Sequence, residues 1–205
     1  MNSKADEVQE FTLPGSRGGQ RRVRILAAFH DCIISKGYSK TTLRDVAKAA
    51  DMSASHLLYY FPGKDTMLEH YFENVAQRIV ERIESFRTES PQQQIDFLAD
   101  LFFAGKGITR SEIGFMLECF GVAVHDKPIR RDKKKLDRFC KSYLQELFER
   151  SPSGPDSAEA YAELSYAMLI GLRTAAYFDK RLGIPKARQL FRNEMMNMAD
   201  FEQAE

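Results

Sequence analysis

Residues 37–68 read GYSKTTLRDVAKAADMSASHLLYYFPGKDTML, and this stretch decides the fold. Thr41 or Thr42 can cap a short helix, and Asp45, three residues after Thr42, can complete a capping box. Ser53 can cap a second short helix, which follows a tight turn. Small alanines stand where the two helices would cross. Two short helices joined in this way predict a helix-turn-helix.

The sequence on both sides of this stretch also predicts helices. From Arg21 onward, apolar residues recur every four positions and predict a helix that Gly37 ends. Pro62-Gly63 ends the second short helix. A long amphipathic helix then begins at Asp65.

The rest of the chain is also predicted to be helical. The predicted helices cover residues 91–106, 109–125, 128–150, 158–181 and 185–201. Thr109 and Glu112 can form a capping box, and SPSGPDS (151–157) is the most loop-like part of this region. We find no strand-like alternation of apolar and polar residues and no repeat, so the predicted fold class is all-α.

Composition argues against a membrane-spanning, secreted or disulfide-bonded protein. Hydrophobic residues make up 43% of the 205-residue chain and charged residues 29%, which is ordinary for a globular protein. No apolar run approaches the roughly 18 residues of a membrane span. The first residues, MNSKADEVQEF, do not resemble a signal peptide. The three cysteines lie far apart, as expected for reduced thiols in the cytoplasm.

Charge is distributed unevenly along the chain. Residues 1–64 contain 10 Lys+Arg and 6 Asp+Glu, a net charge of +4, whereas residues 65–205 contain 20 and 23, a net charge of −3. A basic N-terminal part on a slightly acidic body indicates a partner that is a polyanion.

The opening stretch resembles the DNA-binding region of the TetR family of transcriptional regulators, over about residues 21–75. The family pattern G-[YF]-x-x-T-[TS] matches from Gly37, and I/V-A-x-x-A-[GD]-[MV]-S matches from Val46. The pattern L-Y-x-Y-F-x-x-K ends in the same frame at Lys64. The remaining residues are similar to the family only in length and helical character.

The resemblance implies which residues meet DNA. Tyr60 and Lys64 match family positions that hold phosphates, and Arg44 matches a position that often reads a base or a phosphate. Phe61 is the expected inner anchor of the second short helix, and small residues at the start of that helix permit close approach to the major groove. The expected DNA-binding residues are Thr42, Arg44, Ser53, Ala54, Ser55, Leu58, Tyr59, Tyr60 and Lys64.

Two positions depart from the family pattern. Leu58 stands where the family usually has tyrosine; leucine cannot bond a phosphate, but it can contact a thymine methyl group. Asp51 stands in the turn where the family usually has glycine. Aspartate tolerates a left-handed backbone better than most residues, so we expect the turn to survive.

The resemblance further implies a homodimeric, ligand-responsive regulator, and a repressor is the first expectation. Its expected parts are a flexible tail (1–20), a helix-turn-helix domain (21–66) and a helical ligand-binding and dimerisation domain (67–205). The last two long helices are expected to form the dimer contact. A small molecule in the C-terminal domain is expected to release a palindromic DNA operator.

Aromatic and apolar residues of the C-terminal part are the candidates for ligand contacts. Taken singly, each also fits an ordinary buried core. As a set they predict a hydrophobic or aromatic effector. The candidates are Phe97, Leu101, Phe102, Phe115, Met116, Cys119, Phe120, Phe139, Tyr143, Tyr166, Leu169 and Tyr177.

Several alternatives remain open from the sequence. The basic run 127–138 is a solvated helix face or a docking site for an anionic ligand such as an acyl-CoA. Arg17, Arg21 and Arg22 belong to a solvated tail or touch DNA. Cys119 and Cys140 could form a redox switch, although buried cysteine is commoner.

Two functions other than a ligand-responsive repressor also remain open from the sequence. A DNA-organising protein would bind DNA without a ligand, and an activator would share the whole pattern. No Ser-His, His-Cys or paired-carboxylate motif stands out, and the four histidines show no metal-ligand spacing. We therefore expect no enzyme activity, no metal and no cofactor.

Overall fold

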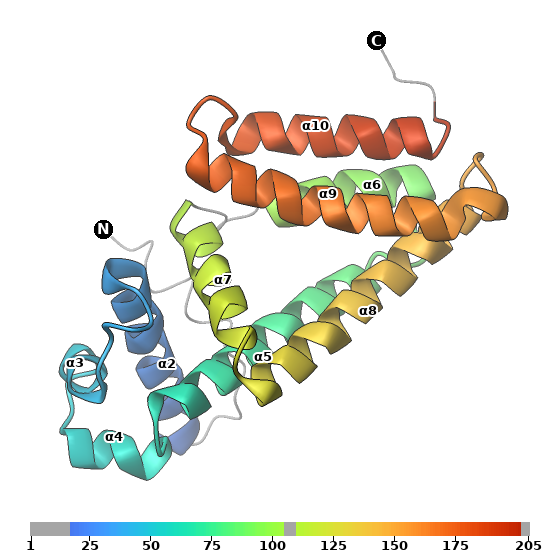
Figure 1. The fold of residues 1–205 in the computed structure, drawn as a ribbon. Coiled ribbons are helices and arrows are strands. Elements are labelled where there is room, and N and C mark those ends of the chain that lie inside the picture. Colours follow the sequence, from blue (N-terminus) through green and yellow to red (C-terminus); the bar gives the residue numbers. More distant parts are fainter. Residues whose placement is uncertain (1–16, 105–109, 202–205) are drawn as a thin grey trace. The chain divides into compact units, whose positions relative to one another are not determined.

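A computed structural model describes residues 17–104 and 110–201 of the chain. Within these ranges the chain is helical and contains no strand, which confirms the all-α fold class (Figure 1). The helices are α2 (Arg17–Lys36), α3 (Leu43–Ala49), α4 (Ala54–Tyr60), α5 (Lys64–Glu84), α6 (Pro91–Phe103), α7 (Arg110–Ala123), α8 (Lys127–Glu149), the short 3-10 helix η1 (Pro155–Ser157), α9 (Ala158–Phe178) and α10 (Gly183–Met198).

Some helix ends differ from the predicted ones. Helix α2 begins at Arg17 rather than Arg21, so the end of the expected tail is helical, and its residues 1–16 lie outside the described ranges. Helix α10 begins at Gly183, which puts Pro185 in the first turn, where its missing N–H is not needed. The predicted capping residue Thr109 also lies outside the described ranges.

The chain forms two compact units that do not follow sequence order. One unit holds the residues up to Val75 together with Gly114–Asp132. The other holds Ala76–Ile113 and the residues from Lys133 onward. Beyond the expected tail, the predicted boundary lies after residue 66, because composition and periodicity carry no signal for a segment that returns to an earlier unit.

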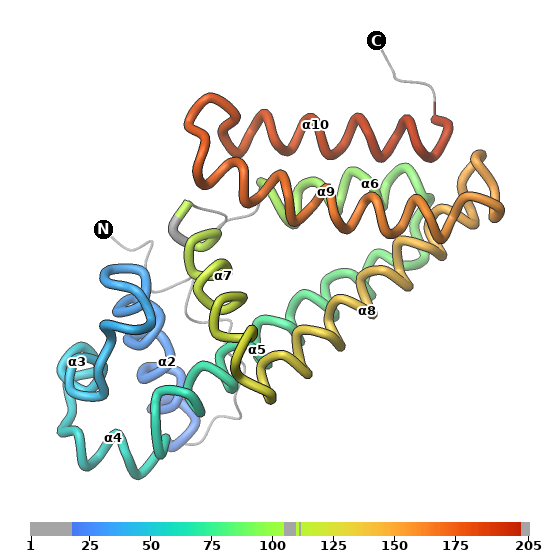
Figure 2. Tube along the Cα trace, in the orientation of Figure 1, coloured from blue at the N-terminus to red at the C-terminus, as the bar shows by residue number. Residues whose placement is uncertain are grey.

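The core of the first unit is built by α2, α3, α4 and the start of α5. Leu26 and Phe29 of α2, Val46 of α3 and Leu57 of α4 are all buried. Phe61 directly follows α4 and is also buried, as predicted for an inner anchor. Figure 2 follows the backbone from α3 through the turn into α4. The predicted helix-turn-helix is therefore present.

In the second unit, α10 packs against both α6 and α9 (Figure 1). Apolar contacts such as that between Phe103 and Phe191, whose ring centroids lie 5.5 Å apart, fill the interior. On the outside, the Arg188 guanidinium lies 2.5 Å from Asp100, which joins α10 to α6. These three helices enclose most of the apolar core of this unit.

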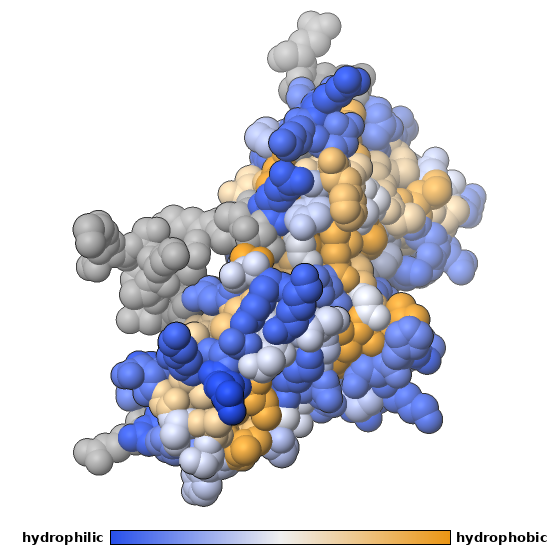
Figure 3. Space-filling view, turned by 60° about the vertical axis from the view of Figure 1, so that its left-hand side comes forward, coloured by the Kyte–Doolittle hydropathy of each residue, from blue (hydrophilic) through white to orange (hydrophobic). Residues whose placement is uncertain are grey.

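Some large apolar side chains stay exposed. Figure 3 shows hydrophilic side chains over much of the visible face, with hydrophobic ones between them. Three of the exposed residues belong to α9 and α10, the helices expected to form the dimer contact. The exposed large hydrophobics among the described residues are Ile34, Leu58, Tyr59, Val124, Leu164, Phe178 and Leu190.

Candidate functional site

Helix α4, the second helix of the helix-turn-helix, presents one face to solvent. The Ser53 hydroxyl accepts a hydrogen bond from the His56 N–H at 3.2 Å and caps the helix, as predicted. Leu57 is fully buried and fixes the inner face, whereas Leu58 is 45% and Tyr59 81% exposed. A short helix with a buried anchor and an exposed outer face is suited to enter a DNA groove.

Helix α3 is fixed at its start by a complete capping box. The Thr42 N–H donates to Asp45 Oδ2 at 2.9 Å, and the Asp45 N–H donates to Thr42 Oγ1 at 3.2 Å, which confirms Thr42 as the cap. The Lys36 ammonium lies 2.6 Å from the Asp45 carboxylate. The hydrogen bonds from Lys36 and Thr42 hold the pKa of Asp45 well below its usual range.

A hollow lies where α3 meets the turn and the start of α4. It is lined by Arg44, Ala47, Lys48, Asp51, Met52 and Ala54. Arg44 and Lys48 lie one turn apart on α3, and both are exposed. Two cations beside a hollow are suited to a phosphate or to the acceptor edge of a base. Arg44 is among the residues predicted from the sequence, whereas Lys48 is not, although their spacing of four residues places them on one helix face.

The turn between α3 and α4 depends on Asp51. Its φ angle is 55°, in the left-handed region. The turn therefore survives with aspartate in place of the usual glycine, as expected. Arg24 of α2 donates to Asp51 Oδ2 at 3.3 Å. This exposed ion pair connects the turn to α2, and no local spacing in the sequence predicts it.

Lys64, at the start of α5, holds the loop between α2 and α3. Its ammonium donates to the carbonyl of Tyr38 at 3.0 Å and to that of Thr41 at 3.4 Å. It also lies 4.3 Å from the centroid of the Tyr38 ring. These contacts give Lys64 a structural role. Because the ammonium has three protons, this role is compatible with the phosphate contact expected from the sequence.

The first unit uses α7 to complete this loop. Glu118 Oε2 accepts the Tyr38 N–H at 3.2 Å, and the Tyr38 hydroxyl donates to Asp65. Burial and the bond to Asp65 raise the pKa of Tyr38. Gly37 has a φ of +82°, and a Cβ there would lie 3.1 Å from Glu118 Oε1. The positive φ favours glycine at this position, and a Cβ would also require the Glu118 carboxylate to shift slightly.

The N-terminal arginines are helical rather than part of a tail. Arg21 Nη1 lies 3.0 Å from Nε2 of His56, so it joins α2 to α4. The Arg22 guanidinium lies 5.4 Å from the centroid of the Phe61 ring. Both arginines are therefore held against the helix-turn-helix and do not belong to a solvated tail. The alternative that they touch DNA stays open.

All nine predicted DNA-binding residues lie in the first unit. Thr42 and Arg44 belong to the start of α3, and Lys64 opens α5. Ser53 caps α4, and the other five, from Ala54 to Tyr60, lie within that helix. Tyr60 is half-buried, and its ring lies 5.2 Å from that of Tyr59.

The twelve predicted ligand contacts are divided between the units. Phe115, Met116, Cys119 and Phe120 of α7 lie in the first unit. There the Phe115 ring lies 4.8 Å from His30 and 4.7 Å from Tyr71, so it is part of that unit's packing. The other eight candidates lie in the second unit.

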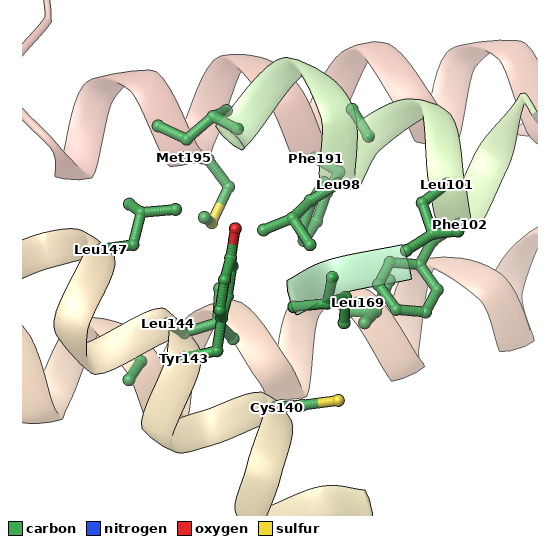
Figure 4. Close-up of a cluster of buried hydrophobic side chains, with 14 of the residues drawn as sticks. Leu98, Leu101, Phe102, Cys140, Tyr143, Leu144, Leu147, Leu169, Phe191 and Met195 are labelled. Carbon is green, nitrogen blue, oxygen red and sulfur yellow. The ribbon is translucent and has the colours of Figure 1, made fainter. Parts of the chain in front are cut away.

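Seven of the eight remaining candidates belong to one apolar cluster or pack against it. Leu101, Phe102, Tyr143 and Leu169 are buried in the apolar cluster of Figure 4. The other four, Phe97, Phe139, Tyr166 and Tyr177, are only partly buried. Phe97 stacks on the Phe86 ring at 3.7 Å, and the Tyr166 hydroxyl donates to Asp137.

The core of the second unit contains polar atoms without partners. In Figure 4 the Tyr143 hydroxyl points into the cluster toward Met195. Within the described ranges no hydrogen bond reaches this hydroxyl, the Ser165 hydroxyl or Nε of Arg173. Burial raises the pKa of Tyr143 to about 12. Unpaired buried groups of this kind are uncommon in folded proteins.

Burial also bears on the cysteine alternative. Cys140 is buried, and burial raises the pKa of its thiol to about 12. The thiol is therefore protonated at neutral pH, which disfavours oxidation. In the described part of the chain no three histidine, cysteine or acidic residues group in a way that could hold a metal ion. None of the described helices is long and apolar enough to cross a membrane.

Comparison with known families now defines the class. Residues 25–71 match the family described as bacterial regulatory proteins, tetR family. Residues 91–199 match the C-terminal domain described as BetI-type transcriptional repressor. The chain belongs to the TetR family of transcriptional regulators, which are DNA-binding proteins and not enzymes. Within that family, its C-terminal part is of the BetI type.

Individual relatives agree with this assignment. HTH-type transcriptional regulator BetI 1 of Chromohalobacter salexigens is 27% identical over 174 residues, which cover 83% of this chain and 86% of the relative. A transcriptional regulator from Rhodococcus sp. Rha1 has a similar fold, with a TM-score of 0.77, 17% identity and coverage of 87% and 96%. The structure of a putative transcriptional regulator from Saccharomonospora viridis in complex with choline is also similar. Its TM-score is 0.77 and its sequence identity 19%, and the match covers 87% of this chain and 96% of that one.

Proposed function

We propose that this regulator is a repressor that binds a two-fold symmetric operator as a homodimer. We further propose that a small molecule with a largely apolar body binds its C-terminal unit and releases the DNA. Since such a regulator works on chromosomal DNA, we place it in the cytoplasm.

The exposed outer face of α4 is the observation that carries the DNA-binding part. Leu58 and Tyr59 are large and largely exposed although they adjoin the fully buried Leu57. The hollow beside them has Arg44 and Lys48 at its edge. In this proposal Leu58 contacts a thymine methyl group, and Arg44 reads a base.

The exposed apolar residues of α9 and α10 support a dimer. Leu164 is 58% and Phe178 70% exposed, and Leu190 is also exposed. Another face of each helix is already occupied, since Leu169 and Phe191 are buried in the core. Helices that are apolar on more than one face need a further partner, and a second copy of these two helices would form a four-helix bundle.

The apolar core of the second unit supports the effector part. Its aromatic and aliphatic side chains offer an environment for an apolar body. The BetI-type match and the choline complex of the Saccharomonospora viridis protein support small-molecule control in general, and choline is the rival effector.

Selection of DNA from a random library with the full-length chain, followed by footprinting, tests this proposal. The expected site is palindromic, and Tyr59→Ala should weaken binding about 10-fold or more. Leu164→Glu should give a monomer by sedimentation, because it places a charge in the apolar contact. Val124→Glu, a change at an equally exposed apolar residue of the other unit, should leave a dimer. Protection of a single asymmetric half-site by a monomer would refute the proposal.

A further inference from the structure

Arg173 is the one charged residue among the buried residues of the described ranges. It lies on α9, on the face that packs into the second unit. The other buried residues of that face are small or apolar apart from one serine; they are Ala158, Ala162, Ser165, Leu169 and Ala176. A cation on such a face requires a compensating group.

The guanidinium of Arg173 is only partly satisfied by hydrogen bonds among the described residues. Nη1 donates to the carbonyl of Phe102 at 3.2 Å, and the guanidinium carbon lies 5.9 Å from the centroid of the Phe102 ring. The carbonyl belongs to the last turn of α6, so this bond has a plain structural role. Nε, which shares the opposite edge with Nη2, has no partner in the described part of the chain.

Other arginines of the same unit are paired with carboxylates. Arg87 bonds Glu84, and Arg192 lies 2.5 Å from Asp96. Both are more exposed than Arg173 and therefore need a counter-ion less. Among the described residues no ion pair between Arg173 and a carboxylate is found, and the charge of Glu112 acts on the guanidinium by raising its pKa.

The charge of Arg173 persists at neutral pH. Burial lowers the pKa of its guanidinium to about 10, so the group is still protonated. The edge formed by Nε and Nη2 carries two parallel N–H groups at the spacing of the two oxygens of a carboxylate.

The surroundings combine this cation with apolar surface. Phe102 and Leu169 are buried nearby in the same core. Tyr177, one turn after Arg173, is partly buried, and the Arg110 guanidinium lies 5.2 Å from the centroid of its ring. A second cation therefore lies toward the same end of α9. A molecule with an apolar body and one anionic group would satisfy both features.

We propose that Arg173 binds the carboxylate of the effector, and that the effector is a monocarboxylate with an apolar body. This rests on the proposed small-molecule control of the C-terminal unit. It also separates this chain from choline recognition, because a quaternary ammonium would meet a buried like charge.

Calorimetry on the full-length chain tests the inference directly. The probes are benzoate, phenylacetate and decanoate, each beside its primary amide and methyl ester, with choline as the cationic probe. At least one carboxylate should bind about 30-fold more tightly than its amide and ester, which corresponds to about 2 kcal/mol. Equal binding of an amide or ester, tighter binding of choline, or no binding of any carboxylate would overturn the inference.

Variants assign the effect to Arg173. Arg173→Met removes the charge at similar volume and should reduce the preference for carboxylate to within about 3-fold. Arg173→Lys keeps the charge without the two-pronged edge and should lose most of the preference. Arg181→Gln, at an exposed position near the end of α9, should keep it. Retained preference in a folded Arg173→Met or Arg173→Lys chain would overturn the inference.

Operator binding without any compound is measured separately. A chain that binds no selected DNA refutes the proposed repressor function. A chain that binds DNA but shows no preference for carboxylates refutes only the role of Arg173.

Discussion

Replacing Lys64 by alanine separates a structural role from a DNA contact. The ammonium donates to two backbone carbonyls and lies over the Tyr38 ring. One charge-assisted hydrogen bond contributes about 1.5 kcal/mol, and a cation–π contact at a partly exposed site contributes about 0.5–1 kcal/mol. The second, longer bond adds little. We therefore expect Lys64→Ala to lower the free energy of unfolding by about 2 kcal/mol.

Operator affinity measured over a range of salt concentrations reveals the second role. If Lys64 also binds a phosphate, its loss should weaken binding to all sequences alike and flatten the salt dependence by about one unit of slope. Urea unfolding gives the stability part independently. Lys40→Ala, at an exposed position, is the control and should change stability by less than about 0.5 kcal/mol. An unchanged salt slope with a lowered stability would show that Lys64 does not touch the DNA backbone.

Three further predictions concern single groups. Arg44→Ala should cost about 1–3 kcal/mol of binding free energy at one operator position and relax the base preference there. Binding to a randomised operator library measures this, and Lys186→Ala is the control that should have no effect. Equal losses across the library would contradict base reading by Arg44. Tyr143→Phe should raise the melting temperature or leave it unchanged, because the buried hydroxyl has no partner to lose; a clear fall in thermal unfolding would indicate a hidden partner. The pKa of Asp45 is lowered in the folded chain, so its contribution to stability is present above about pH 4 and is lost as the pH falls below that value; urea unfolding of Asp45→Asn should therefore show a weaker loss of stability with acid than the parent, and identical acid profiles would refute this.

Local signals in the sequence were sufficient for the helix-turn-helix. Thr42 and Ser53 are helix caps because their hydroxyls act within three residues, and the sequence contains that spacing. Asp51 follows from the same local logic, since aspartate tolerates the left-handed backbone conformation that it adopts there. Periodicity likewise placed the long helices within a few residues of their observed ends.

Contacts between distant residues could not be predicted in this way. Glu118 bonds the backbone of Tyr38 across 80 positions, and no spacing rule relates the two. Arg173 was overlooked for a different reason. Its place on the apolar face of α9, four residues after Leu169, is visible in the sequence, but its lack of a carboxylate partner depends on side chains from other helices.

The return of α7 to the first unit has a consequence for synthesis. The ribosome releases the helix-turn-helix early, yet Phe115 and Glu118, which pack against His30 and bond Tyr38, emerge much later. The N-terminal unit therefore reaches its final packing only after the segment Gly114–Asp132 has left the ribosome. A graft of the first 75 residues onto another protein would carry the helix-turn-helix but not the partners that complete its core.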